Sequence, residues 1–507
     1  MTNPEGASRN LPRWAARERL REKGQFWTPE WVAKAMAAYV MTQPTDVLFD
    51  PAVGAGAFFR AAKSLARERG TPICCRGMEI DPEILKQALE DGNLQAEDTA
   101  GIAIGDFTLQ PPQEKLSAIV ANPPYIRHHR LSAEKKEALR HMCAQIIGSA
   151  IDGRAGLHVY FLLRALTLLK AGGRLAIILP ADVCEGKYAR DIWGWITTHF
   201  AVDAVITFAP AASPFPAVDT NPIVFFIRKA PPEEQFWWAK CHRTQTNALQ
   251  EWVLRGLEAK EYDDLKMMRR SIKEGLATGF SREPCERQEE GYVLGDFAKV
   301  IRGIATGAND FFFLNSRQIE ALGLPESYFV RAIGRTRDVS GDAVTATTLN
   351  ALDLAGRPTF LLSLNGQDKT TFPDALQRYL ALGEEKGLPT RPLLAQRKPW
   401  YKMEVRTPPP LLFAYLGRRN SRFIRNYAQV VPLTGFLCLY PHWSNAEYIE
   451  RLALVLNHPD MLTNLSKIGK SYGAGAIKVE PRWLEQLPIP DRVVQTYKLP
   501  TQMRLWA

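Results

Sequence analysis

The stretch Ile119-Val120-Ala121-Asn122-Pro123-Pro124-Tyr125 governs how the rest of the sequence is interpreted. Small and apolar residues from Ala118 to Ala121 predict the buried end of a β-strand, with Asn122 at its tip. The two prolines fix φ and supply no N–H donor, so the strand ladder ends there and its carbonyls remain available. An amide oxygen, such carbonyls and the ring of Tyr125 suit a planar ligand that carries an exocyclic amino group.

Alternating strands and helices surround this stretch. Strands that alternate with helices predict an α/β fold, a Rossmann-like parallel sheet that is doubly wound. Two later strands, at 202–208 and 223–227, are close enough along the chain to form a hairpin. We therefore expect seven strands with an antiparallel hairpin at one edge. The expected strands are 47–49, 73–78, 102–104, 118–121, 174–179, 202–208 and 223–227.

Three carboxylates are expected where successive strands end: Asp50, Glu79 and Asp106. The carboxyl ends of parallel strands meet at one edge of a sheet, where α/β proteins bind their ligands. Each carboxylate alone is more often a helix cap or a solvated loop residue. Together they predict a nucleoside pocket, with Glu79 on the ribose hydroxyls, Asp106 on the adenine amino group and Phe107 against the ring.

A glycine turn, Gly54-Ala55-Gly56, follows the first strand. It has only two glycines of the dinucleotide-binding fingerprint, so it could be a simple tight turn between strand and helix. No Lys or Arg lies there to bind a pyrophosphate. An adenosine attached to a cationic group therefore fits better than NAD, and S-adenosylmethionine is such a molecule.

Composition narrows the cellular setting. The chain has 507 residues and a formal net charge of +10, which suits a polyanionic partner but is shared by ribosomal and membrane-surface proteins. Its seven cysteines form no CxxC pair, which indicates a reducing compartment rather than disulfides or a zinc cluster. The polar N-terminus and the lack of a long apolar run predict no secretory signal and no membrane span. We expect a cytoplasmic, nucleoid-associated protein without a metal.

The pattern changes after about residue 230. We expect a catalytic domain at 1–235, a bridging helical segment at 236–290 and an irregular α+β domain at 291–507. The last domain has many prolines and scattered Arg and aromatic residues, and it has lost the alternation of strands and helices.

With these residues identified, the chain resembles adenine-N6 DNA methyltransferases of the γ arrangement, which have the cofactor motifs first and the recognition domain last. Asn122-Pro123-Pro124-Tyr125 is identical to the catalytic tetrapeptide of that family. Further matching segments are Gly24-Gln25-Phe26-Trp27-Thr28-Pro29, Asp50 to Gly56, Glu79-Ile80-Asp81, Gly105-Asp106-Phe107, Phe161 and Phe215-Pro216. Softer matches in the C-terminal half are Leu294-Gly295-Asp296, Arg302 to Gly307, Lys470 to Lys478 and Leu487 to Pro490.

The resemblance implies a site-specific methyltransferase that flips an adenine out of duplex DNA and methylates its N6 with S-adenosylmethionine. The implied catalytic residues are Asn122, Pro123, Tyr125 and Phe215. The implied cofactor-binding residues are Thr28, Asp50, Ala52, Gly54, Gly56, Glu79, Ile80, Asp106, Phe107, Asn122 and Phe161. We expect a monomer that belongs to a restriction-modification or related defence system, with any cognate endonuclease encoded separately, or an orphan methyltransferase.

Contacts with double-stranded DNA are predicted from basic residues near aromatic ones, because such side chains suit phosphates and base edges. The candidates are Arg127, Arg130, Arg302, Arg335, Arg337, Arg397, Lys398, Arg418, Arg419, Arg422, Lys470 and Lys478.

Other activities remain open at this point. The same tetrapeptide occurs in enzymes that methylate cytosine N4, RNA amino groups or a protein glutamine, and a DNA-binding protein could keep the fold without activity. Pro373-Asp374 and Glu384-Glu385-Lys386 imitate a nuclease pattern, but the residues between them predict a helix and not the strand hairpin that such a site needs.

Overall fold

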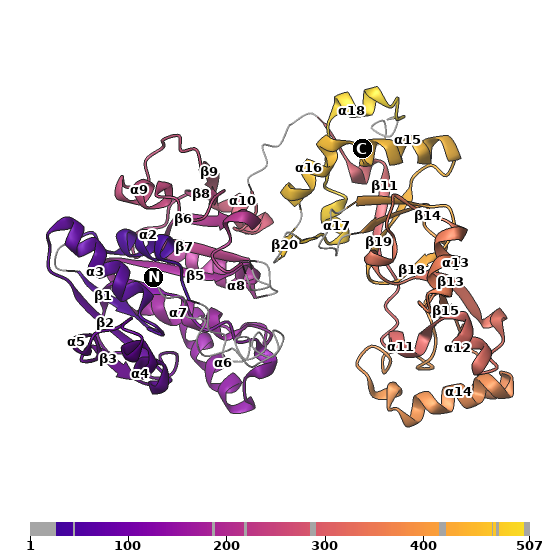
Figure 1. Ribbon diagram of the computed structural model, residues 1–507, viewed down its shortest axis with the longest axis horizontal. Helices are drawn as coiled ribbons and strands as arrows, with labels where there is room; N and C mark the ends of the chain where they lie inside the picture. Colours follow the sequence, from indigo (N-terminus) through magenta and orange to yellow (C-terminus); the bar gives the residue numbers. More distant parts are fainter. Residues whose placement is uncertain are drawn as a thin grey trace. The chain divides into compact units, whose positions relative to one another are not determined.

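The computed structural model describes residues 27–43, 46–184, 188–216, 221–283, 291–414, 422–468, 470–472 and 476–500. The chain divides into two compact units, Met1–Pro284 and Cys285–Ala507. In Figure 1 the first runs from indigo to magenta and the second from orange to yellow. Among the described residues, no helix is long and apolar enough to cross a membrane.

A single nine-stranded sheet forms the centre of the first unit, in the order β3-β2-β1-β4-β5-β7-β6-β8-β9. Neighbours from β3 to β5 run parallel, whereas β7 is antiparallel to both β5 and β6. The strands are β1 (Val47–Asp50), β2 (Cys74–Glu79), β3 (Ile102–Ile104), β4 (Leu116–Ala121), β5 (Leu169–Pro180), β6 (Ala201–Phe208), β7 (Pro222–Arg228), β8 (Gln235–Cys241) and β9 (Leu265–Ser271).

Helices cover both faces of this sheet, and β4 shows why the two hydrophobic cores are separate. Ile119 and Ala121 pack with α6, α7 and α8 on one face, while Ala118 and Val120 pack with α2, α3 and α9 on the other. All four are buried, as expected for a central parallel strand. The helices of this unit are α2 (Glu30–Val40), α3 (Ala57–Arg69), α4 (Pro82–Glu90), α5 (Ala96–Thr99), α6 (Ala133–Ile147), α7 (Leu157–Leu168), α8 (Ala189–His199), α9 (Ala248–Leu254) and α10 (Ile272–Thr278).

The prediction of seven strands with a hairpin at the edge is wrong in two respects. The sheet has nine strands, and although β6 and β7 do pair antiparallel, they lie inside it. The predicted bridging segment at 236–290 is also wrong, because β8 and β9 continue the sheet through that region. The charged residues of β9 hide the strand pattern: Lys266 is exposed, but Arg270 is buried where an apolar side chain would be expected.

The second unit is an irregular α+β structure. Its larger sheets have five strands, in the order β11-β19-β16-β17-β14, and four strands, in the order β12-β15-β13-β18. Its strands are β10 (Tyr292–Val293), β11 (Ala298–Arg302), β12 (Phe313–Leu314), β13 (Phe329–Ile333), β14 (Ala343–Val344), β15 (Phe360–Leu362), β16 (Leu411–Ala414), β17 (Arg422–Asn426), β18 (Val431–Pro432), β19 (Phe436–Pro441), β20 (Lys470–Tyr472), β21 (Ala476–Lys478) and β22 (Pro488–Ile489). Its helices are α11 (Asn309–Phe312), α12 (Ser316–Ala321), α13 (Ala346–Leu354), α14 (Asp374–Glu385), α15 (Ala446–Leu456), α16 (Pro459–Ile468), α17 (Pro481–Leu484) and α18 (Asp491–Thr496).

The imitated nuclease pattern lies on α14, which begins at Asp374 and ends at Glu385. The segment between the two halves of that pattern is therefore a helix, as predicted, and not a strand hairpin. Glu384 is engaged by Lys369, whose Nζ lies 2.7 Å from Glu384 Oε2.

Arg270 ties the end of the first unit to β9. Its side chain is fully buried, and its guanidinium donates to the carbonyls of Gly279, Phe280 and Arg282 at 2.9 to 3.2 Å. Its Nε donates to Glu274 Oε1 at 3.1 Å. The burial of this cation is thus compensated by several acceptors, and the residues after α10 are held against the sheet.

We predict that Arg270→Met destabilises the first unit by about 3 kcal/mol or more, because buried carbonyls lose their donor. The neighbouring Arg269 gives a matched control: it is exposed, with its guanidinium 5.0 Å from the Trp237 ring. Arg269→Met should change stability by about 1 kcal/mol at most. Urea unfolding of the full chain measures both, and equal effects of the two substitutions would contradict this role of Arg270.

Candidate active site

A pocket lies where β1 to β4 end, at the carboxyl edge of the sheet. Its empty volume is about 950 Å³, including the part open to solvent, a size ordinary for a small-molecule site. Ten of the residues predicted to bind a cofactor line it: Thr28, Asp50, Ala52, Gly54, Glu79, Ile80, Asp106, Phe107, Asn122 and Phe161. Gly56, Pro123, Tyr125 and Phe215 lie outside this lining.

Glu79 connects two backbone segments at the pocket. Its Oε2 accepts the N–H of Gly54 at 2.9 Å, and its Oε1 accepts the N–H groups of Ile80 and Asp81 at 2.8 and 3.0 Å. The carboxylate therefore joins the glycine turn after β1 to the end of β2. Gly56 begins α3 with φ of 72°, and a Cβ there would meet Leu94 Cδ2 at 2.3 Å, so this turn requires glycine.

Asp50 is a buried carboxyl at the end of β1, with 1% of its surface exposed. Its Oδ1 accepts the N–H of Ala52 at 3.0 Å, while its Oδ2 has no hydrogen-bond partner among the described residues. Burial, and to a smaller extent the charge of Glu79, raise the pKa of Asp50 to about 8, although the bond from Ala52 acts in the opposite direction. This end of the pocket presents an acceptor without a protein donor.

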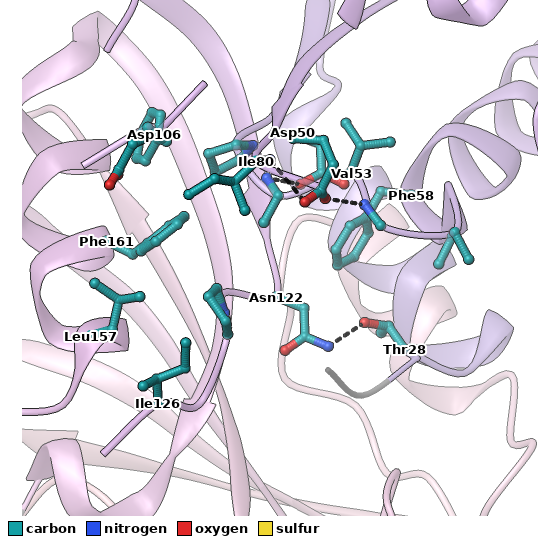
Figure 2. Close-up of a pocket in the computed structure, with 18 of the residues that line it drawn as sticks. Thr28, Asp50, Val53, Phe58, Ile80, Asp106, Asn122, Ile126, Leu157 and Phe161 are labelled. Carbon is teal, nitrogen blue, oxygen red and sulfur yellow. Dashed lines mark hydrogen bonds between the residues drawn. The ribbon is translucent and has the colours of Figure 1, made fainter. Parts of the chain in front are cut away.

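Asp106 has the opposite electrostatics. Burial would raise its pKa, but hydrogen bonds from Lys135 and Thr108 lower the pKa below its ordinary value. Lys135 Nζ lies 2.7 Å from Asp106 Oδ2, and both the backbone N–H and the hydroxyl of Thr108 donate to Oδ1. The rings of Phe107 and Phe161 lie beside this carboxylate, with centroids 5.3 Å apart. Figure 2 shows Asp106 and Phe161 on the same side of the pocket.

Asn122 and Thr28 point toward each other on the side of the pocket away from Asp106 (Figure 2). Asn122 Nδ2 donates to Thr28 Oγ1 at 3.0 Å, which directs the amide oxygen to the other side, as Figure 2 shows. This bond joins residues that are 94 positions apart. The carbonyl of Pro124 accepts the N–H of Ile126 at 3.0 Å, so the prediction of available carbonyls does not hold for Pro124.

Tyr125 and Phe215 are close together, but their faces are not parallel. Their centroids are 6.4 Å apart and their planes meet at 78°, an edge-to-face contact. The hydroxyl of Tyr125 donates to the carbonyl of Ile178 at 3.3 Å, and burial raises the pKa of this hydroxyl well above its ordinary value. Phe215 is also buried, with 5% of its surface exposed.

Sequence reasoning missed several residues of this region. Trp27 and Lys135 line the pocket, and Asp182 lies two residues beyond the end of β5. The signal for Asp182 was present, since it is a carboxylate after a strand, like Asp50 and Glu79. No sequence pattern pointed to Lys135, because its approach depends on how α6 crosses the pocket.

The predicted DNA contacts differ in their surroundings. Arg127, Arg130, Arg335, Arg337 and Lys398 are exposed. Three others make contacts within the chain: Arg302 forms an ion pair with Glu480, Arg397 donates to the carbonyl of Ala305, and Arg422 donates to the carbonyl of Gly341. Arg418 and Arg419 are not among the described residues. Only the backbone is described for Lys470 and Lys478, which are opposite each other in the register of β20 and β21.

Two protein families match this chain. Residues 11–261 match the family described as N-6 DNA Methylase, and residues 283–504 match the C-terminal domain of the type II methyltransferase M.Eco57I. The methylase match precedes the C-terminal one, which is the order of the γ arrangement. The two matches together span most of the chain.

Individual relatives agree with these families. The type II methyltransferase M.AccI of Acinetobacter calcoaceticus is 24% identical over 480 residues, which span 92% of this chain and 85% of the relative. M.XamI of Xanthomonas campestris pv. amaranthicola is 23% identical over 492 residues, with the same two shares. The structure of the type IIL restriction-modification enzyme MmeI in complex with DNA is similar in fold, with a TM-score of 0.51 and 12% identity over 94% of this chain and 64% of that one. The chain therefore belongs to the N-6 DNA methylases and is an S-adenosylmethionine-dependent adenine DNA methyltransferase.

Proposed function

We propose that this methyltransferase flips one adenine from a specific duplex site and methylates its N6, as the modification enzyme of a restriction-modification system. The observation that carries the proposal is the convergence of Asp50, Glu79, Asp106 and Asn122 on one pocket. The relatives M.AccI and M.XamI, both type II methyltransferases, support the assignment to such a system. We propose that the enzyme is a cytoplasmic monomer and that residues 291–507 recognise the DNA site.

The pocket residues fit S-adenosylmethionine. Asp50 Oδ2, buried and without a donor among the described residues, suits the ammonium group of the methionine part. Glu79 accepts three backbone N–H groups, and lone pairs that remain on its oxygens would accept ribose hydroxyls. Asp106 Oδ2 would accept the adenine amino group beside Lys135, with Phe161 against the ring. Thr28, Ala52, Gly54, Ile80, Phe107 and Asn122 also line the pocket and would complete the site, while Gly56, which lies outside that lining, would contribute through the tight turn before α3.

When bound, this cofactor supplies a methyl group attached to a sulfonium. The protein's own part is to hold the acceptor. Asn122 Oδ1 and the carbonyl of Pro123 would accept hydrogen bonds from the adenine amino group, which concentrates the nitrogen lone pair toward the methyl carbon. The bond from Asn122 Nδ2 to Thr28 keeps the amide oxygen directed toward that amine. Positioning is then the main catalytic factor, and the methylated nitrogen loses its proton to water.

An adenine reaches this site only after leaving the stack of the duplex. Tyr125 and Phe215 would hold it by stacking, each contributing about 1–3 kcal/mol. Their present edge-to-face contact leaves no slot between parallel faces. At least one ring therefore has to turn when the base enters, while the bond from the Tyr125 hydroxyl to the Ile178 carbonyl holds the tip of that ring.

The function is tested by methylation-aware sequencing of DNA from cells that express the chain. We expect N6-methyladenine at one defined sequence, and that sequence then supplies the substrate for all further assays. N4-methylcytosine at a defined site would refute adenine as the target base. Unmodified DNA together with methylation of RNA or a protein glutamine would refute DNA as the substrate.

We predict that Asn122→Ala lowers kcat by at least about 100-fold, because the amine loses the acceptor that orients its lone pair. Binding of S-adenosylmethionine, measured by calorimetry, should change little in comparison. The exposed Asn350, on α13, provides a control, and Asn350→Ala should keep wild-type turnover. Retained turnover in Asn122→Ala would remove this residue from the mechanism.

The buried Asp50 predicts a specific pH dependence of stability. Its folded-state pKa is about 8 and its ordinary value is 3.8, so the folded chain keeps this proton to higher pH than the unfolded chain does. The contribution of Asp50 to the free energy of unfolding is therefore largest at low pH and is lost as the pH rises from about 4 to about 8. Asp50→Asn removes that loss, and the variant should gain on the order of a few kcal/mol relative to wild type by pH 8.

Thermal unfolding of the cofactor-free protein from pH 5 to pH 8.5 measures this difference. The Tm of Asp50→Asn minus that of wild type should increase with pH. Asp91→Asn, at an exposed position after α4, should show no such trend. A constant difference for Asp50→Asn across the range would show that Asp50 is ionised in the folded state throughout.

A further inference from the structure

His158 is a buried polar residue near the start of α7 that the mechanism above does not use. Only 3% of its surface is exposed, and it lies on the sheet face that α7 covers. Its ring meets the ring of Tyr125 edge to face, with centroids 6.1 Å apart and planes at 72°. A histidine in direct contact with the tyrosine of the catalytic tetrapeptide can influence where that ring lies.

His158 is itself held by a carboxylate. Its Nε2 lies 3.3 Å from Asp182 Oδ1, and Asp182 follows the end of β5. The Asp182 side chain is 63% exposed; although partial desolvation acts to raise its pKa, His158 and, less strongly, Arg127 lower this pKa below its ordinary value. The imidazole of His158 thus has Asp182 near its Nε2 and meets the Tyr125 ring edge to face.

The backbone around His158 is joined to the segment that carries Tyr125. The N–H of Leu157 donates to the carbonyl of Ile126 at 2.9 Å. Gly156 makes room for this approach, since a Cβ there would lie 2.7 Å from His158 Cε1 and 3.0 Å from the Ile126 carbonyl oxygen. The start of α7 therefore supports the backbone of the residues that follow Asn122.

Two further contacts of Tyr125 among the described residues, with Ile178 and with Phe215, are not equivalent to the one from His158. The hydroxyl bond to Ile178 fixes the tip of the ring but allows the plane to rotate about its long axis. The contact with Phe215 has to change when a base enters between the two rings. Phe215 packs in the core on one face of the sheet and α7, which carries His158, packs in the core on the other, so the His158 contact can persist through base entry.

We propose that His158, held by Asp182, is a positioning residue that sets the plane of Tyr125 for stacking on the extruded adenine. This inference rests on the proposed function, in which Tyr125 stacks on the base. The residue acts through Tyr125 and does not touch the reacting atoms. His158 holds the Tyr125 ring in the stacking orientation before the base arrives. Base binding then has less conformational freedom of this ring to remove.

The first test compares single-turnover methylation rates of full-length variants on a duplex containing the site found by sequencing. His158→Ala should lower the rate by roughly tenfold to 100-fold, because a misplaced ring misplaces the base. His158→Phe should recover most of the rate, since it restores a ring edge against Tyr125. Asp182→Ala should show a smaller loss, because it frees the imidazole without removing it. The affinity for S-adenosylmethionine should stay near wild type in all three, and the rates are compared well below the Tm of each variant, because truncation of the buried His158 lowers stability.

A double-substitution cycle with Tyr125→Leu separates positioning from general structure. If His158 acts through Tyr125, adding His158→Ala to Tyr125→Leu should slow the reaction no further. Multiplied losses in the double variant would overturn the inference. If Tyr125→Leu alone keeps full activity, the proposed stacking role fails first, so the two failures are distinguishable.

A spectroscopic measurement gives an independent result. The target adenine is replaced by 2-aminopurine, whose fluorescence rises when it leaves the duplex and falls when an aromatic ring stacks on it. His158→Ala should give brighter emission from the bound duplex than wild type, and His158→Phe should restore the wild-type level. His199→Phe, a change at an exposed histidine on α8, should have no effect. Unchanged emission in His158→Ala would overturn the inference.

Discussion

The parallel pairing of β3, β2, β1, β4 and β5 is the constraint from which the active site follows. Parallel neighbours end at the same edge of a sheet, so whatever residue follows each strand is brought to that edge. Asp50, Glu79, Asp106, Asn122 and Asp182 all reach it in this way. The numbers of residues between them along the chain are irregular, but the distances between them in the fold are set by the distance between neighbouring strands.

The acids at this edge are alike in sequence and different in chemistry. Asp106 has a lysine and a threonine to stabilise its charge, whereas Asp50 has one backbone donor and a carboxylate nearby. A carboxyl that resists ionisation and one that favours it thus line the same pocket. A cationic group beside Asp50 would supply the positive charge that this carboxyl lacks and would favour its ionised form, whereas Asp106, whose charge is already stabilised, can accept a neutral amino group.

Much of the site could be predicted from the sequence because its signals are local. The tetrapeptide, the glycine turn and the strand-end acids each occupy a few consecutive residues, and a parallel sheet determines how they meet. Lys135 could not be found this way, since its approach to Asp106 depends on the path of α6. His158 looked like an ordinary helix residue, and only the contact with Tyr125 distinguishes it.

The fold was predictable where strands are apolar and not where they carry charge. Residues 118–121 of β4 and 175–179 of β5 are continuous buried runs of small and apolar side chains, but β9 contains Arg270, whose buried cation is compensated by carbonyls from residues further along the chain. A sequence pattern that equates charge with solvent therefore misses β9. The edge-to-face arrangement of Tyr125 and Phe215 was equally hidden, because residue types do not specify the angle between two rings.

The bonds of Arg270 also limit where the second unit, which we propose to recognise DNA, could be exchanged between relatives. A join placed at residue 235 would remove β8 and β9 and expose the side of β6 that they cover. A join before Arg282 would leave the buried guanidinium without one of its acceptors. A junction after Glu283 keeps β8, β9 and the Arg282 acceptor of Arg270 in the first unit, so under the proposed function an exchangeable recognition domain would begin beyond that residue.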